Sequence, residues 1–138
     1  MILYSQDKLR AELRRDEGYR RFPYTDTTGN LTIGVGWNLS ANGLPDFVIE
    51  QLLDIGVTQA RQVVSEALPE WRTLSDARQR VLINMGYNLG NKLKSFRRTL
   101  AAVKRGDYEA AARGMLRSRW AKQVGDRAKR LAKMMQEG

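Results

Sequence analysis

The sequence lacks two residue types that carry much of enzyme chemistry. It contains no cysteine, which excludes disulfide bonds and thiolate metal sites. It also contains no histidine, the commonest metal ligand and the usual base at neutral pH. Any acid–base chemistry must therefore come from carboxylates, lysines or tyrosines.

Long apolar stretches are also missing. The apolar start of the chain is only four residues long, whereas a secretory signal needs about 7–15 apolar residues after a basic start. No run reaches the roughly 18 apolar residues that a membrane-spanning helix requires. We therefore expect a protein that is made without a signal peptide and does not insert stably into a membrane.

The composition is that of an ordinary globular protein with an uneven charge. The 138 residues are 42% hydrophobic and carry a net charge of +9, and this length favours one domain. Residues 1–70 contain seven basic and ten acidic residues, whereas residues 71–138 contain seventeen basic and five acidic residues. The basic half favours a polyanionic partner, which is a nucleic acid, an anionic membrane face or a cell-wall polymer that carries carboxylates.

Capping and turn signals divide the chain into a short mixed segment followed by helices. Ser5 is placed to cap a helix that runs to Gly18, and residues 19–37 flank a cluster of turn formers, which predicts a β-hairpin. Pro45 predicts the start of the next helix, and Gly56 is expected to break or kink it. Later helices are predicted near residues 58–68, 75–89, 92–104, 107–118 and 126–136. The fold class is α+β and mainly helical, with a small N-terminal lobe and a helical C-terminal lobe flanking a cleft.

Two carboxylates of the mixed segment are candidates for acid–base chemistry. Glu17 ends the first predicted helix and Asp26 opens the turn of the hairpin. Extended chain would separate them by about 30 Å, so only the chain reversal at the hairpin lets them cooperate. Glu17 would then donate a proton, while Asp26, whose charged form is favoured by the amides of the turn, would orient a water beside the hydroxyl of Thr32. A helix-end Glu, a turn-opening Asp and a strand Thr each also have an ordinary structural interpretation.

A specific resemblance covers most of the chain. Its motifs are Asp16-Glu-Gly-Tyr-Arg20, Tyr24-Thr-Asp-Thr-Thr-Gly29 and Leu31-Thr-Ile-Gly-Val-Gly36. This pattern resembles the active-site region of the T-even phage lysozymes, and residues 83–90 and 118–130 resemble the family's cleft helix and C-terminal segment. The family's catalytic acid, water-holding Asp and assisting Thr correspond to Glu17, Asp26 and Thr32.

The resemblance implies both a fold and an activity. The fold is one lysozyme-like domain over residues 1–138, with an α+β lobe near residues 14–56 and a helical lobe formed by residues 1–13 and 57–138. The activity is that of a monomeric muramidase that needs no metal or cofactor. It hydrolyses the β-1,4 bond between N-acetylmuramic acid and N-acetylglucosamine in peptidoglycan, with inversion. Such an endolysin is made in the host cytoplasm and reaches the periplasmic wall after release by another factor, or is carried in the virion.

The resemblance also assigns roles to residues other than Glu17, Asp26 and Thr32. Arg127 corresponds to an Arg that would orient the catalytic Glu, although it also fits a solvated basic helix face. Asn88 corresponds to an amide near the bound sugar, and Asn84 lies one turn earlier; either could instead satisfy the local backbone. Trp120 is expected to anchor helices in the core. Trp37 departs from the family, which often has a His there.

The N-terminal lobe also departs from the family, and rival functions remain open. Only residues 38–44 separate the hairpin from the next helix, a shorter stretch than the family has, so the number of sugar subsites is open.

A lytic transglycosylase, which needs one acid–base Glu and yields anhydro products, is the enzymatic rival. A basic nucleic-acid-binding or structural phage protein is the rival from another class, although we expect no nucleic-acid partner. The last helix, with Leu131, Met134 and Met135, could contact an anionic outer membrane transiently or could pack in the core.

Overall fold

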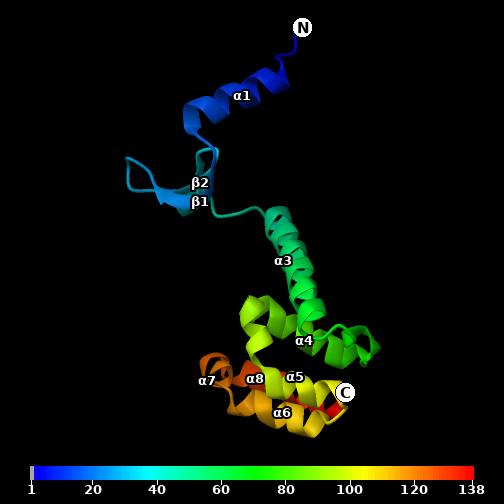
Figure 1. Cartoon of the computed structure of the whole chain (residues 1–138). Helices are drawn as coiled ribbons and strands as arrows, with labels where there is room; N and C mark the ends of the chain where they lie inside the picture. The colour runs from blue at the N-terminus through cyan, green and yellow to red at the C-terminus, as the bar shows by residue number, and fades with distance from the viewer. Residues whose placement is uncertain (1) are drawn as a thin grey trace. The chain divides into compact units, whose positions relative to one another are not determined.

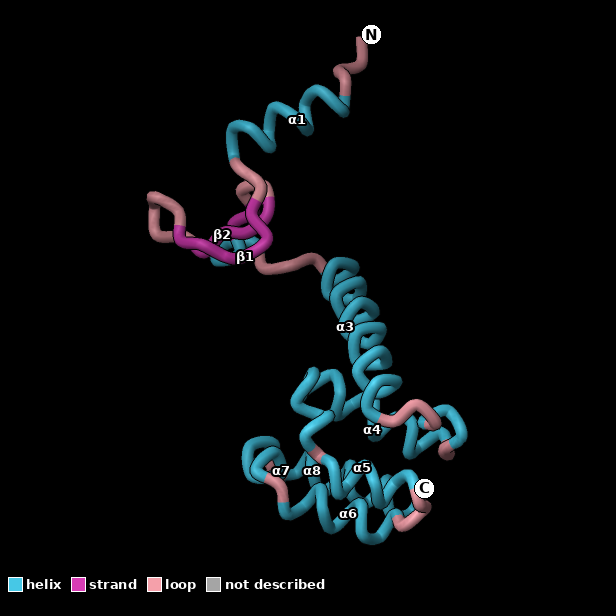
Figure 2. The backbone as a smooth tube through the Cα atoms, viewed as in Figure 1, coloured by secondary structure: helices cyan, strands magenta, loops and turns pink. Residues whose placement is uncertain are grey.

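A computed structural model describes residues 2–138, and the chain divides into unit 1 (Met1–Glu50) and unit 2 (Gln51–Gly138). About 71% of the residues are helical, and a three-stranded antiparallel sheet completes a mainly helical α+β fold, as predicted (Figure 1 and Figure 2). The elements of unit 1 are α1 (Gln6–Glu17), β1 (Arg20–Thr25), β2 (Leu31–Gly34), β3 (Trp37–Asn38), α2 (Leu39–Asn42) and the start of α3 (Asp46–Ala67). Those of unit 2 are the rest of α3, the 3₁₀ helix η1 (Trp71–Thr73), α4 (Asp76–Leu89), the 3₁₀ helix η2 (Gly90–Ser95), α5 (Arg97–Lys104), α6 (Tyr108–Arg117), α7 (Arg119–Val124) and α8 (Asp126–Glu137).

Helix α1 begins and ends where its local signals predict. The Ser5 hydroxyl accepts a hydrogen bond from the Lys8 N–H at 3.3 Å, which satisfies one of the free amides of the first turn. At the other end the Gly18 N–H donates to the Arg14 carbonyl at 2.9 Å, with Gly18 at φ +87°. The chain leaves the helix there, so Glu17 is its last residue.

The predicted hairpin is present and gains a short third strand. Strands β1 and β2 pair antiparallel, with Thr25 opposite Leu31 beside the turn and Arg20 opposite Gly34 at the open end. The register is irregular between Arg20 and Tyr24, as at a β-bulge. Strand β3 extends the sheet on the other side of β2, so the strand order is β1-β2-β3.

The prediction that Gly56 ends one helix before another begins is wrong, because α3 runs without interruption from Asp46 to Ala67. A glycine inside a helix costs only about 1 kcal/mol relative to alanine, which the rest of a long helix offsets. The structure shows why a glycine stands here. A Cβ at position 56 would lie 2.5 Å from Cε2 of Tyr87, so the missing side chain makes room for the tyrosine ring of α4.

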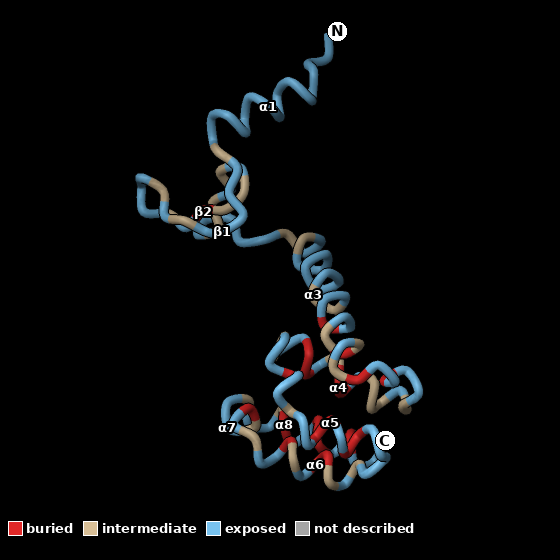
Figure 3. The backbone as a smooth tube through the Cα atoms, in the orientation of Figure 1, coloured by how far each residue is buried: buried red, intermediate tan, exposed pale blue. Residues whose placement is uncertain are grey.

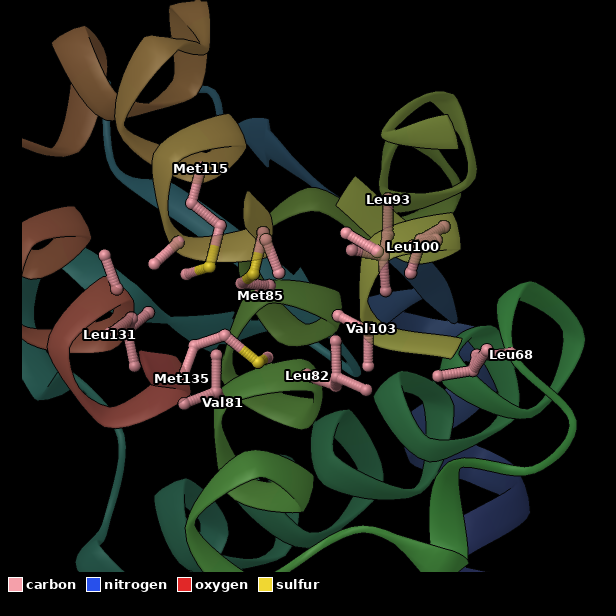
Figure 4. Close-up of a cluster of buried hydrophobic side chains, with 14 of the residues drawn as sticks. Leu68, Val81, Leu82, Met85, Leu93, Leu100, Val103, Met115, Leu131 and Met135 are labelled. Atoms are coloured by element: carbon pink, nitrogen blue, oxygen red, sulfur yellow. The ribbon is translucent and has the colours of Figure 1, made fainter. Parts of the chain in front are cut away.

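The hydrophobic core lies in unit 2 and is built on α4, around which α5, α6 and α8 supply most of the other side chains. Val81, Leu82 and Met85 of α4 are at most 1% exposed, and Met115 and Met135 are fully buried. Figure 3 shows the buried positions gathered in these helices, and Figure 4 shows their side chains converging. Burial of each large apolar side chain stabilises the fold by roughly 1.5–3 kcal/mol.

Two helix predictions in unit 2 need correction. The helix predicted near residues 92–104 is instead η2 followed by α5, because Phe96 between them adopts φ −79° and ψ 53°, which is outside the helical region. Helix α7 was not predicted, yet it forms after Ser118, whose hydroxyl accepts from the Ala121 N–H at 3.1 Å. A six-residue helix leaves too short a periodic pattern to be recognised.

Helix α8 places its apolar side in the core. Leu131 is 5% exposed, Met135 is fully buried, and Met134 packs partly buried against the same cluster. The last helix therefore uses these residues for packing, which decides between its two interpretations. Among residues 2–138 no helix combines the length and apolarity needed to cross a bilayer.

Candidate functional site

Glu17 lies against the returning strand of the hairpin. A Cβ built on Gly36, at φ +66°, would lie 2.5 Å from Oε2 of Glu17 and 3.1 Å from its Cδ. Only a glycine can allow this approach, because it has no side chain and adopts positive φ without strain. The chain reversal therefore brings the segment after β2 back to the end of α1, and Gly36 is the residue that meets the carboxyl group. The sequence analysis did not predict that Gly36 would contact Glu17. The pattern Gly34-Val-Gly36 was the signal that could have indicated it.

Asp26 is held by the turn that it opens. Its Oδ1 accepts hydrogen bonds from the Asn30 N–H at 2.8 Å, the Thr28 N–H at 2.9 Å and the Thr28 hydroxyl at 2.9 Å. The pKa of Asp26 is lowered below its ordinary value, chiefly by the Asn30 N–H and next by the Thr28 hydroxyl, because these donors stabilise the charged form. The turn thus favours the carboxylate, as the sequence predicted.

The two oxygens of Asp26 differ in what they contact. All three hydrogen bonds go to Oδ1, and Oδ2 accepts none from any of residues 2–138. The charge is therefore fixed in position by one oxygen, while the other stays available for a water or a ligand group.

Thr32 supports the same turn from β2. Its side chain is 3% exposed, and its hydroxyl donates to the Asn30 carbonyl at 3.0 Å. The N–H of Asp26 donates to that carbonyl as well, at 2.9 Å. Thr32 thus braces the loop that positions Asp26, a structural contact that the sequence did not predict.

The hairpin separates the two carboxylates along its length. Asp26 lies at the closed end, next to the pair Thr25–Leu31, whereas Glu17 meets Gly36 beyond the open end, where Arg20 pairs with Gly34. Five residue steps of strand span about 16 Å. The bulge between the ends shortens this distance. The carboxyl groups of Glu17 and Asp26 therefore lie in the same unit but adjoin opposite ends of the hairpin.

The predicted supporting residues lie in unit 2 and form two pairs. Arg127 donates from Nε and Nη2 to Oδ1 of Asn84, at 3.0 and 2.8 Å. Oδ1 of Asn88 accepts from the indole N–H of Trp120 at 2.8 Å. Each amide oxygen thus accepts from a side chain far away in the sequence and not from the local backbone. The guanidinium group of Arg127 is likewise bonded to Asn84 and does not only face solvent.

Both tryptophans that the sequence singled out have structural contacts. Trp120 is 3% exposed and packs edge to face on Phe96, with ring centroids 6.2 Å apart, which confirms its core position. Trp37, where the family often has a His, donates its N–H to the Gly43 carbonyl at 2.7 Å and so closes the short loop around α2. No cluster of three metal-ligating side chains occurs in the part of the chain that the structure describes.

Comparison with known proteins identifies the family. Residues 14–136 match the phage lysozyme family, and the chain belongs to it. The match includes both units and all the candidate residues described above.

One relative is a spike protein of a bacteriophage. The pre-baseplate central spike protein Gp5 of Enterobacteria phage T4 is 28% identical over 155 aligned positions, which cover 91% of this chain and 27% of that protein. The chain therefore spans about a quarter of the length of this relative.

Proposed function

We propose that the protein is a muramidase that hydrolyses the β-1,4 bond between N-acetylmuramic acid and N-acetylglucosamine in peptidoglycan. The observation that carries this proposal is the state of Asp26, a carboxylate held ionised through Oδ1 with Oδ2 left open. Membership of the phage lysozyme family supports the substrate class. Glu17 is the second carboxyl group of the same unit, at the residue where the family has its acid.

In this mechanism Glu17 is protonated and gives its proton to the glycosidic oxygen as the bond from that oxygen to the sugar C1 breaks. Asp26 takes a proton from a water through Oδ2, and the water oxygen forms the new bond to C1 from the opposite face. The products are two shorter glycans, one with a free reducing end of inverted configuration. Thr32, through the lone pairs of its hydroxyl, is proposed to assist in holding that water.

The resemblance to the T-even phage lysozymes is what supports inversion over retention. A retaining enzyme needs its carboxyl groups only about 5–5.5 Å apart, whereas an inverting one needs about 6.5–9.5 Å to admit the water. Glu17 and Asp26 adjoin opposite ends of a strand pair, so the inverting spacing requires the bulge and the substrate-bound state to bring the two groups closer than the strand length alone would. The hydrogen-bonded carboxylate of Asp26 argues against a lytic transglycosylase, which has no use for an ionised Asp placed to hold a water.

The remaining assignments belong to the same proposal. We infer one lysozyme domain over residues 1–138, acting as a monomer on the periplasmic wall after release by another factor or from the virion; the spike protein supports the second route. Arg127, held by Asn84, is proposed to orient Glu17. Asn88 is proposed to act near the sugar through its amide nitrogen, since its oxygen is engaged by Trp120.

The test is lysis of permeabilised Gram-negative cells, followed by turbidity, with wild type beside Glu17→Gln and Asp26→Asn. We expect each variant to lose about a hundredfold or more, because each removes one acid–base partner. Glu12→Gln, an exposed residue of α1 with the same change in charge, is the matched control and should lyse normally. Equal lysis by all four proteins would exclude the proposal.

Mass spectrometry of the digested wall decides between the two enzymatic mechanisms. Hydrolysis adds one water to each pair of fragments, and lytic transglycosylation leaves an anhydro-sugar end. Anhydro ends would contradict the role given to Asp26.

A further inference from the structure

A recess with a strongly basic lining lies within unit 2, between η2, α5, α6 and the start of α7. Its volume is about 910 Å³. Its charged lining residues are seven cations and no carboxylate: Lys92, Arg97, Arg98, Arg105, Arg113, Arg117 and Arg119. We call this recess the basic groove.

Most of these cations have no acidic partner in the fold. Arg105 lies 3.5 Å from Asp107 and Arg113 lies 3.5 Å from Glu109. The other five form no ion pair with any of residues 2–138. Concentrating five uncompensated charges of one sign costs stability, so an anionic ligand would relieve their mutual repulsion.

A threonine hydroxyl and a helix start lie in the same groove. Thr99 lines the groove and is 7% exposed as a residue. Its hydroxyl makes no hydrogen bond among residues 2–138 and is therefore open to solvent, because every buried side-chain oxygen or nitrogen of those residues has a partner. That hydroxyl faces Gly114, another lining residue, where a Cβ would come within 2.5 Å of it. Thr99 also lies in the first turn of α5, whose N-cap Phe96 provides no side-chain cap. Uncapped amides and a positive dipole end favour an anion at this point.

The size and the lining of the groove indicate what kind of anion it takes. A volume of about 910 Å³ suits a ligand of a few sugar residues and cannot admit duplex DNA, whose phosphates lie on a broad convex surface. The lining also includes the partly buried ring of Phe96 and the polar side chains of Ser95 and Gln123, whereas Trp120 belongs to the core and is only 3% exposed. Aromatic faces and hydrogen-bonding groups suit a sugar ring, and guanidinium groups suit phosphate oxygens.

We propose that the basic groove binds a phosphorylated glycan of the bacterial envelope, with phosphate on the arginines at the start of α5 and α7 and sugar beside Phe96, Ser95 and Gln123. None of its residues belongs to the carboxylate pair of unit 1, so the site does not depend on the proposed hydrolysis. Its role is to hold the protein on a phosphate-bearing surface.

The experiment is calorimetric titration of the full chain with the soluble core oligosaccharide of lipopolysaccharide. The same oligosaccharide after phosphatase treatment is the paired ligand. We expect the phosphorylated form to bind at least about tenfold more tightly, since a charge-assisted bond to a guanidinium contributes that much. Equal binding of the two forms would overturn the proposal.

Variants separate a defined site from general positive charge. Arg98→Ala should weaken binding about tenfold, and Thr99→Val, which removes the hydroxyl without changing the shape of the side chain, should also weaken it. Arg61→Ala removes the same charge from an exposed position of α3 outside the groove and should change the Kd less than twofold. Equal losses in Arg98→Ala and Arg61→Ala would overturn the proposal.

Duplex DNA is the competing ligand class. At equal phosphate concentration, a 30-base-pair duplex should not displace the oligosaccharide from the groove. Displacement that Arg98→Ala abolishes would assign the groove to nucleic acid instead. Because the titration measures binding alone, its failure leaves the lysis experiment unaffected, and the reverse also holds.

Discussion

The two units of this small lysozyme-family protein are organised by different forces. Unit 1 contains six basic and seven acidic residues, whereas unit 2 contains eighteen basic and eight acidic residues. Thr32 is the one buried residue of unit 1 among residues 2–50, and every residue of the hydrophobic core lies in unit 2. Unit 1 therefore holds its shape through capped ends, turn hydrogen bonds and glycines, and unit 2 through apolar burial.

Because of this difference, the candidate catalytic residues lie in unit 1, whereas most of the free energy of unfolding comes from the core of unit 2. The acid–base candidates sit in a segment whose geometry depends on single hydrogen bonds and one close approach, so small changes there should alter activity. Core changes in unit 2 should alter the free energy of unfolding and leave the chemistry of the folded fraction intact. The following changes test that separation, from the largest expected effect to the smallest.

Met85→Ala should produce the largest loss of stability. Met85 is 1% exposed at the centre of the core, and truncating such a side chain costs about 2–5 kcal/mol through lost burial and the cavity left behind. Urea unfolding monitored by circular dichroism measures this loss. Leu116→Ala, at a position 49% exposed, is the control and should cost far less. If the two cost the same, unit 2 does not owe its stability to this core.

Gly36→Ala should produce the largest loss of activity without a matching loss of stability. The added Cβ would displace the Glu17 carboxyl, and a displacement of about 1 Å costs about a hundredfold in rate. Gly34→Ala is the matched control, because Gly34 has the same φ of +66° with nothing within 4 Å of its Cβ position. Turbidity assays and thermal unfolding of both variants separate displacement from backbone strain. Equal activity of the two variants would show that the approach of Gly36 to Glu17 is not required.

Asn88→Ala tests whether Asn88 serves the fold or the substrate. Removing Oδ1 leaves the indole N–H of buried Trp120 without a partner, which should cost about 1–3 kcal/mol. Asn91→Ala, an exposed residue of η2, is the control. A variant that keeps its unfolding free energy but loses activity would assign Asn88 to substrate binding alone.

Thr28→Ala should have the smallest effect, confined to low pH. Losing the hydroxyl donor raises the pKa of Asp26 towards its ordinary value of 3.8, so the acidic limb of the activity profile moves to higher pH. The lowered pKa also stabilises the fold above that value, and this contribution is lost as pH falls through the pKa of folded Asp26. Activity between pH 3 and 7 measures the shift, with Thr27→Ala as the control. An unmoved acidic limb would mean that Asp26 does not control it.

Local sequence signals predicted unit 1 well because its determinants lie close together in the chain. The Ser5 cap, the Gly18 end and the Asp26 turn all depend on contacts between residues at most four apart. Their residue types have strong local preferences, so helix, hairpin and carboxylate candidates follow from the printed order of residues. The family resemblance likewise depends on motif spacing and was confirmed by the match over residues 14–136.

The sequence reasoning failed where a distant side chain decided the outcome. Gly56 was read as a helix breaker because a glycine's local preference is clear, whereas the Tyr87 ring that requires it lies 31 positions away. Asn84 and Asn88 were predicted to lie near the sugar or to bond their local backbone, but their oxygens accept from residues 43 and 32 positions away. No local pattern carries that information.

The sequence by itself thus determined the fold class and the uneven charge and nominated the carboxylate candidates Glu17 and Asp26, all of which depend on residue identity and short-range order. The tertiary structure alone decided that Gly36 receives Glu17, that one oxygen of Asp26 stays open, and that five unpaired cations share a recess with the hydroxyl of Thr99. The physical reason is that hydrogen bonds and charges act through space. Residues brought together by packing acquire partners that their place in the chain does not indicate.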